Sequence, residues 1–247
     1  MGTTKIEWAD AVWNPATGCT KVSAGCANCY AEVMARRFGR EGFDKDDRPL
    51  GVFDFRVLIH PDRLDQPLHW RKPRRVFVCS MGDLFHEDVP DSFIYDVLNV
   101  AVAAQRHTFM VLTKRPKRMQ RIMVGRKLPM PANLWLGVSD EGCCHGRIDY
   151  LRATPAALRF VSFEPLLCDP RTVNLDGIGL VICGGETGNG ARGMDSKWAR
   201  SLRDQCSDAG VPFFFKHHGS WHDRRQHDNS DNQGRLLDGR EWNQFPK

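Results

Sequence analysis

The sequence predicts an α/β fold whose parallel strands form one sheet, either open or closed into a barrel. Between residues 75 and 216, short apolar runs alternate with segments of helical periodicity, as expected for repeated strand–helix units. The apolar runs are nearly continuous rather than alternating, which is typical of parallel strands covered on both faces. The chain has 247 residues, a length that is common for a single barrel of this class.

Each predicted strand is a short run rich in apolar, β-forming residues. A first strand is expected at residues 11–14, and six more are expected at 75–80, 107–112, 134–138, 158–163, 179–183 and 211–216. Helices are expected at 29–38, 90–105, 116–124, 141–153 and 196–209. One side of the second helix carries Phe93, Ile94, Val97, Leu98 and Ala101. An apolar side of this kind is expected to pack on the sheet.

The expected domain organisation is one barrel over residues 1–221 and a polar C-terminal extension over 222–247. No linker rich in Pro, Gly or Ser divides the chain. Residues 39–54 carry turn residues and mixed charge and are expected to leave the barrel as a loop, before an extra strand at 56–59. Near the C-terminus, residues 235–245 are expected to dock back on the barrel through Leu236, Leu237 and Trp242.

Composition narrows the class of protein. No apolar run approaches the roughly 20 residues of a membrane span, and residues 1–10 contain no apolar signal core. A cytoplasmic protein without membrane contact is therefore expected. Nine cysteines are an odd number in a chain that is not small, which favours reduced thiols over disulfides. Ordinary core positions are expected for Cys79, Cys168, Cys183 and Cys206.

Three cysteines near the N-terminus are the most informative residues. Cys19, Cys26 and Cys29 lie in one loop, residues 14–30, with the spacing C-x6-C-x2-C. Thiolates are soft ligands that suit iron–sulfur clusters and zinc, and a cubane held by protein alone uses four of them. Three clustered cysteines therefore predict a cluster with one open iron, where a small molecule can bind and react. A metal or redox role is left open for a second group, Cys143, Cys144 and His145.

Polar residues follow directly after the predicted strands. In parallel α/β folds the carboxyl ends of the strands meet at one edge, and binding sites form there. Six polar strand ends in register predict one shared site at this edge rather than six unrelated turns. The residues concerned are Ser80, Gly82, Asp83, Thr113, Lys114, Arg115, Ser139, Asp140, Glu164, Gly184, Gly185, Glu186, Lys216, His217 and His218.

The loop that ends in Cys26, Cys29 and Tyr30 resembles the cluster loop of radical SAM enzymes, where the usual spacing is C-x3-C-x2-C. Over residues 5–221 the chain is more similar to a phage-associated, three-cysteine radical-SAM-like group. Short motifs carry this similarity: WNP at 13–15, TGC at 17–19, GC at 25–26, CYA at 29–31, DLFH at 83–86, TKRP at 113–116, SFEPL at 162–166 and GGE at 184–186.

The resemblance implies a partial or full (β/α) barrel of radical SAM type with parallel strands. It also implies two cofactors, a [4Fe–4S] cluster and S-adenosyl-L-methionine. The three cysteines would hold the cluster, and its open iron would chelate the amino and carboxylate groups of S-adenosylmethionine. One electron into the sulfonium would break a carbon–sulfur bond, and the resulting 5′-deoxyadenosyl radical would abstract hydrogen from a substrate. This chemistry also implies a flavodoxin-like or ferredoxin-like electron donor.

Under the resemblance, each strand end receives an expected role. Gly82 and Asp83 would meet the cofactor amine, because a glycine permits close backbone approach and a carboxylate complements an ammonium. Lys114 or Arg115 would pair with the cofactor carboxylate, and Ser139 would bond a ribose hydroxyl. The other expected cofactor contacts are Ser80, Glu164, Gly184, Gly185 and Glu186. The expected catalytic residues are Tyr30, His86 and Lys216, of which the histidine fits a structural role equally well.

The expected substrate is a nucleic acid base or a nucleotide, in a modification or repair reaction. The net charge is +5, and basic residues cluster at 71–75 and 114–127. Such clusters neutralise phosphates, although a solvated surface has the same composition. The alternative is a non-enzymatic, zinc-binding nucleic-acid-binding protein in which a histidine completes the three-cysteine set. A hydrolase on the same barrel is less favoured, because no H-x-E pattern lies near Cys26 and Cys29.

Overall fold

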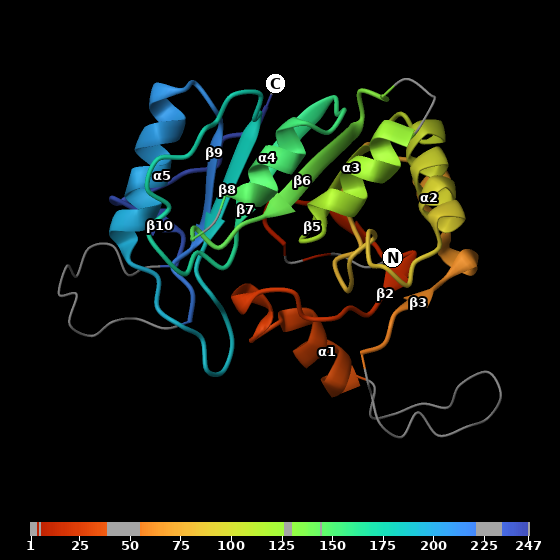
Figure 1. Cartoon of the computed structure of the whole chain (residues 1–247), viewed down its shortest axis with the longest axis horizontal. Coiled ribbons are helices and arrows are strands. Elements are labelled where there is room, and N and C mark those ends of the chain that lie inside the picture. The colour runs from red at the N-terminus through yellow and green to blue at the C-terminus, as the bar shows by residue number, and fades with distance from the viewer. Residues whose placement is uncertain are drawn as a thin grey trace.

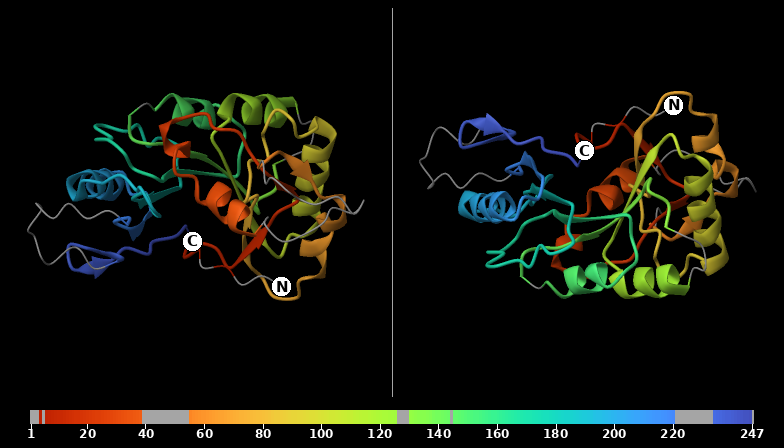
Figure 2. Two further views of the ribbon diagram at one scale, coloured as in Figure 1. Left: turned by 90° about the horizontal axis from the view of Figure 1, so that it is seen from below. Right: turned by 90° about the horizontal axis from the view of Figure 1, so that it is seen from above.

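The centre of the computed structural model, which describes residues 4, 6–38, 55–125, 130–143, 145–220 and 234–246, is a parallel sheet. The sheet has seven strands in the order β1-β4-β5-β6-β7-β8-β9, so sequence neighbours pair. Their bounds are β1 Ala11–Trp13, β4 Arg75–Val78, β5 Thr108–Thr113, β6 Leu134–Ser139, β7 Leu158–Phe163, β8 Leu180–Gly184 and β9 Phe213–His217. The sheet curls into a half-barrel (Figures 1 and 2), which confirms the predicted α/β barrel in its partial form.

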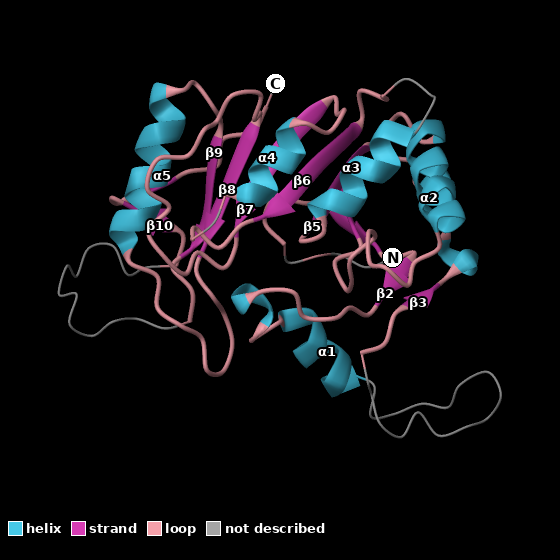
Figure 3. Cartoon of the chain, in the orientation of Figure 1, coloured by secondary structure: helices cyan, strands magenta, loops and turns pink. Residues whose placement is uncertain are grey.

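Helices cover the outer face of the half-barrel (Figure 3). They are α2 Asp91–Ala103, α3 Pro116–Gly125, α4 Gly146–Arg152 and α5 Ser196–Asp208. A further helix, α1 Tyr30–Phe38, lies apart from these, below the sheet in Figure 1. Short 3₁₀ turns occur at Ala24–Cys26, Pro61–Arg63 and Gln66–His69. These helices agree with the predicted ones except at α4, which begins five residues later than expected.

The late start of α4 has a local cause. After β6, Gly142 adopts a left-handed φ of +90°, and its N–H donates to the Asp140 carboxylate at 2.7 Å. This turn diverts the chain before a helix can begin. The next residue, Cys143, forms a disulfide with Cys168, and the two Cα atoms are 5.6 Å apart. The segment is therefore held in a turn where periodicity alone predicts a helix.

The Cys143–Cys168 disulfide corrects the expectation that all nine cysteines are reduced. The loops after β6 and β7 lie side by side, with Leu167 N–H donating to the Glu141 carbonyl at 3.0 Å, and this proximity brings the two thiols together. The other described cysteines are unpaired: Cys19, Cys26, Cys29, Cys79, Cys183 and Cys206. Cys144 lies outside the described residues.

The apolar core has two parts, one on each face of the sheet. The larger part lies between the sheet and the outer helices, and α2 contributes to it the five residues predicted from its periodicity. The smaller part fills the inside of the half-barrel, because alternate residues of the strands point inward. Trp8, from the segment before β1, inserts there with its ring 4.6 Å from that of Phe77.

Two short ribbons attach to the half-barrel. The first pairs β2 Ala16–Thr17 with β3 Leu58–Ile59, antiparallel, which confirms the extra strand expected at 56–59. The second pairs β10 Leu236–Leu237 with β11 Arg240–Glu241. Leu237 is buried, and Phe215 N–H donates to the Trp242 carbonyl at 2.8 Å. The C-terminal segment therefore docks as predicted, whereas the expectations for 39–54 and 222–233 fall outside the described residues.

None of the described helices has both the length and the apolar character needed to cross a membrane.

Candidate functional site

A cavity of about 390 Å³ lies at the carboxyl edge of the sheet, beside the cysteine loop. Its volume is within the usual range for small-molecule sites, roughly 300–1,000 Å³. Cys19, Cys26 and Cys29 all line it. The strand ends contribute Ser80, Gly82, Asp83, Thr113, Lys114, Arg115, Ser139, Glu164, Gly185, Glu186, Lys216 and His217. The structure thus brings the three cysteines and residues from all six predicted strand ends to one cavity.

Part of the cavity wall is apolar, formed by Trp8, Phe77 and Leu112 from the inside of the half-barrel. Two polar atoms on lining residues are buried without a hydrogen-bond partner among the described residues, Nε1 of Trp8 and Nδ1 of His217. Buried polar atoms are almost always hydrogen-bonded in native proteins. Because both atoms are closed off from solvent, they are enclosed in the wall and do not face the cavity.

Close backbone packing determines the path of the cysteine loop. Gly18 has a left-handed φ of +82°, and a Cβ placed on it would lie 1.8 Å from the Arg56 carbonyl oxygen. A Cβ on Gly82 would lie 2.8 Å from the Gly18 carbonyl oxygen. The N–H of Gly18 donates to the Met81 carbonyl at 2.9 Å, and that of Cys19 donates to the Phe55 carbonyl at 3.0 Å. The loop therefore passes between two backbone segments with no room for a side chain at Gly18.

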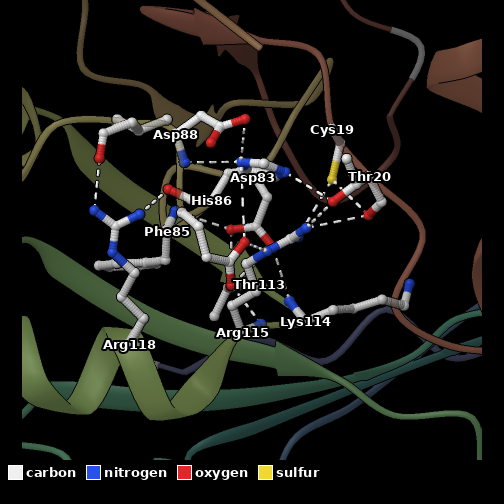
Figure 4. A network of polar contacts seen from close by, with 12 residues as sticks. Cys19, Thr20, Asp83, Phe85, His86, Asp88, Thr113, Lys114, Arg115 and Arg118 are labelled. Carbon is white, nitrogen blue, oxygen red and sulfur yellow. Dashed lines mark hydrogen bonds and ion pairs between the residues drawn. The ribbon is translucent and has the colours of Figure 1, made fainter. Parts of the chain in front are cut away.

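Arg115, which follows β5, holds the start of the cysteine loop (Figure 4). Its Nη1 donates to Cys19 Sγ at 3.3 Å and to Asp83 Oδ2 at 3.3 Å. Its Nη2 donates to the Thr20 hydroxyl at 2.8 Å and to the Thr20 carbonyl at 3.1 Å. Its Nε donates to Glu87 at 2.8 Å. The guanidinium is thus already occupied within the protein.

Asp83 is likewise occupied. Its carboxylate accepts from the Thr113 hydroxyl at 2.8 Å and from the N–H groups of Phe85 at 2.9 Å and Lys114 at 3.1 Å. The Lys114 side chain, in contrast, extends out of this network in Figure 4, and its ammonium has no hydrogen-bond or ion-pair partner in the described part of the chain. Of the charges expected to meet the cofactor, Lys114 is therefore the available one.

His86 contacts the cysteine loop from outside the cavity. Its Nδ1 accepts from the Asp88 N–H at 3.1 Å, so the neutral ring carries its proton on Nε2, which lies 2.8 Å from the Thr20 hydroxyl. Burial and the nearby Arg115 charge lower the pKa of His86, which favours this neutral form. His86 does not line the cavity, and its contacts match the structural role that the sequence left open.

Glu186 and Arg192 hold the other end of the cysteine loop. Arg192 Nε donates to Glu186 Oε2 at 2.9 Å, and its Nη2 donates to the Ala24 carbonyl at 2.8 Å. Asn28 Nδ2 donates to Glu186 Oε2 at 3.0 Å. The hydrogen bonds from Arg192 lower the pKa of Glu186 to about 2. Glu186 is therefore ionised and positions the loop rather than meeting a ligand with a free carboxylate.

Glu141 contacts the middle of the loop, a role that sequence reasoning missed. It accepts from the Ser23 hydroxyl at 2.6 Å and from Arg147 Nη1 at 2.7 Å. A Cβ on Gly25 would lie 2.5 Å from Glu141 Oε1, so the loop backbone packs directly on this carboxylate. Ser23 and Glu141 are 118 residues apart in the chain, and no local pattern connects them.

The thiols of the loop differ in their electrostatic surroundings. Burial, followed by the Asp83 charge, raises the pKa of Cys19. At Cys26, burial acts in the same direction, but the Val22 backbone, the Lys114 charge and Ser23 outweigh it and lower the pKa. Because the thiolate is the form that binds metal, Cys26 is the better prepared of the two ligands.

Glu164 and Lys216 form an ion pair in the cavity wall, with Lys216 Nζ 3.0 Å from Glu164 Oε1. The Ser162 hydroxyl donates to the same carboxylate at 3.1 Å. Burial alone would raise the pKa of Glu164, but the Lys216 charge lowers it, and the Glu164 charge in turn raises the pKa of Lys216. Gly184 makes room for the pair, since a Cβ there would lie 2.9 Å from Glu164 Oε1.

Tyr30, at the start of α1, lines the cavity and donates its hydroxyl to the Ser80 carbonyl. Burial of the hydroxyl, reinforced by the charges of Cys29 and Glu164, raises its pKa. The residue as a whole remains 48% exposed. Tyr30 therefore connects the end of the cysteine loop to the end of β4 while staying protonated.

Comparison with known proteins identifies the family. A family model for a protein of unknown function, DUF5131, matches residues 3–246. The chain belongs to this family. No curated protein matches it, and no solved structure does. The features of this DUF5131 chain that bear on its function are the cavity and the residues that line it.

The donors of this DUF5131 site fit an iron–sulfur cluster. Cys19, Cys26 and Cys29 are unpaired and line one cavity. Thiolates are soft ligands that suit such clusters as well as zinc. Among the described residues, no group of three or more His, Cys, Asp or Glu side chains is placed to hold a metal ion as the structure stands.

Proposed function

We propose that this chain is a radical-SAM-type enzyme in which Cys19, Cys26 and Cys29 hold a [4Fe–4S] cluster and S-adenosylmethionine binds in the adjoining cavity. One observation carries the proposal: three unpaired thiols and the polar ends of six parallel strands line the same cavity. When bound, the cluster would supply an electron to the sulfonium and an open iron for the methionine part of the cofactor. The strand ends would bind and orient the rest of that molecule.

The proposed role of each polar side chain depends on whether it is already paired within the protein. Lys114 is free to pair with the cofactor carboxylate, whereas Arg115 and Asp83 position the cysteine loop. Lys216 stays protonated because Glu164 raises its pKa, so at neutral pH it acts as a charge or proton donor and not as a base.

The proposed substrate is a nucleic acid base or a nucleotide, which the reaction would modify or repair. An aromatic, apolar wall next to cationic side chains suits a planar base attached to phosphate. The electron would come from a flavodoxin-like or ferredoxin-like partner. We propose a cytoplasmic location for the enzyme.

Anaerobic reconstitution with iron and sulfide tests the proposal. The dithionite-reduced wild-type chain is expected to give an EPR signal of a reduced cluster, which shifts when S-adenosylmethionine is added. Cys26→Ala is expected to lose the signal. The matched control is Cys206→Ala, which removes a buried thiol of α5 and is expected to keep it.

Two outcomes would contradict the proposal. One is a chain that assembles no cluster. The other is an EPR signal that changes neither when S-adenosylmethionine is added nor in Cys26→Ala. Elemental analysis of anaerobically purified protein separates the alternative. One tightly held zinc per chain without labile sulfide would support the zinc-binding, nucleic-acid-binding protein.

A further inference from the structure

A second hollow of about 970 Å³, here called the basic groove, adjoins the cavity on the outer side of the cysteine loop. Val22, Lys114 and Arg115 line both hollows, so the two share a wall. Its other lining residues come chiefly from α3 and the start of α4, which lie side by side in Figure 1. The basic side chains that line it are Lys114, Arg115, Lys117, Arg118, Arg121 and Arg147. The acidic ones are Glu87, Asp91 and Glu141.

Three arginines of the groove, Arg115, Arg118 and Arg147, are already hydrogen-bonded within the protein. Arg118 donates to the Val89 carbonyl and to Asp91, each at 2.6 Å. Arg147 donates to Glu141 at 2.7 Å, and Arg115 is occupied as described above. These side chains build the groove wall and neutralise its carboxylates.

Positive charge remains after these pairings. Lys114 has no ion pair within the described ranges, and Lys117 contacts only the face of Tyr150 there, with Nζ 5.5 Å from the ring centre. Arg121 is 63% exposed and must share Asp91 with Arg118. Lys114, Lys117 and Arg121 therefore face the groove with little negative charge beside them. A groove of this kind suits an anionic ligand.

The spacing of these cations indicates a chain of phosphates rather than one phosphate. Lys117 and Arg121 lie on successive turns of α3, about 6 Å apart along its axis, and Lys114 stands just before that helix. The row therefore starts at the cavity wall and leads away from it. Tyr150 adds an aromatic ring to the groove wall, where the Lys117 ammonium lies over its face.

We propose that the basic groove binds the backbone of a single-stranded nucleic acid and that an adjacent base enters the cavity. The inference rests on the proposed function, which puts the reaction in that cavity. A base within a duplex cannot reach an enclosed site unless it leaves the stack, so an unpaired strand is the form that fits. Lys114 lies at the boundary, where the groove and the cavity meet.

Fluorescence anisotropy with labelled single-stranded DNA and RNA, each about 12 nucleotides long, tests the groove in the full chain. Removing two charges with Lys117→Gln and Arg121→Gln is expected to weaken binding about tenfold at low salt. The slope of log K against log salt is expected to fall by about 1.4, because each phosphate neutralised on a single strand contributes about 0.7 to it. Arg71→Gln with Lys72→Gln is the matched control, because it removes the same charge from the exposed cluster at 71–75.

The groove is supported if the control changes the affinity less than about twofold while Lys117→Gln with Arg121→Gln reduces both affinity and slope. Equal effects of the two double variants would overturn it, because binding would then follow net charge. A further contrary result is a mononucleotide that binds as tightly as the strands and is weakened equally by Lys117→Gln with Arg121→Gln. That result would overturn the proposal that the groove binds a strand and would indicate a site for a single phosphate. Comparing the affinities for DNA and RNA shows which of the two backbones the groove binds.

Cluster measurements on the same proteins separate this inference from the proposed function. The groove variant is expected to keep the wild-type EPR signal and its response to S-adenosylmethionine. A chain that forms the cluster but binds neither strand contradicts the groove alone. A chain that binds strands through the groove but forms no cluster contradicts the radical mechanism alone.

Discussion

Arg115 donates a hydrogen bond to the sulfur of Cys19, which precedes it by 96 residues, at 3.3 Å. The same guanidinium contacts Thr20 and Asp83. A residue at the end of β5 therefore fixes where the first cysteine of the loop stands. The site depends on this tertiary contact as much as on the spacing of the cysteines.

Replacing Arg115 with lysine is expected to lower the free energy of unfolding by about 3 kcal/mol, because one ammonium cannot serve Cys19, Thr20, Glu87 and Asp83 together. Urea denaturation at pH 7 measures the change. Arg121→Lys is the control, since its guanidinium is exposed and is expected to contribute less than about 1 kcal/mol. Equal effects of the two substitutions would show that the buried network adds no stability.

Gly18→Ala is expected to destabilise the chain by about 3 kcal/mol, because the left-handed φ and the Arg56 carbonyl leave no room for a methyl group. Gly146→Ala is the matched control. Gly146 begins α4, and a Cβ placed on it would meet nothing within 4 Å, so alanine there is expected to raise stability by about 0.5 kcal/mol. Thermal melts of both variants distinguish crowding from a general effect of replacing glycine.

Lys216→Met is expected to cost about 3 kcal/mol, because it leaves Glu164 buried without its partner. Adding Glu164→Gln to this variant is expected to restore most of the stability, since no unpaired charge then remains. Urea denaturation of the two single variants and the double variant completes the cycle. Additive effects would contradict the pairing.

Glu186 makes stability depend on acid pH. Its pKa in the folded chain is about 2, against an ordinary value of 4.5, so its ionised form stabilises the fold above pH 4.5. That contribution is lost as the pH falls from 4.5 through about 2. Glu186→Gln is expected to lower stability by about 1 kcal/mol at pH 7, and the difference from wild type is expected to shrink across this window. Glu241→Gln, at an exposed position, is the control in the same acid titration.

Local patterns in the sequence were enough to predict most of the fold. The seven strands and the buried side of α2 follow from apolar runs and helical spacing, because side-chain burial repeats at short range. The prediction was wrong at residues 141–143 and 145, where the turn at Gly142 and the Cys143–Cys168 disulfide replace helix. The partner of that disulfide is 25 residues away, beyond the range of helical periodicity.

The sequence by itself determined most of the polar residues that gather at the cavity, because parallel strands bring their carboxyl ends to one edge, although the predicted His86 lies outside it. Only the tertiary structure decided which of these residues are available to a ligand. Arg115 is occupied by the cysteine loop and by Asp83. Asp83 is occupied by Arg115 and Thr113. The Lys114 ammonium, in contrast, has no partner in the described part of the chain. Whether a charge is free depends on partners that lie far away in the chain. Because these partners come together only in the folded chain, local composition does not predict them.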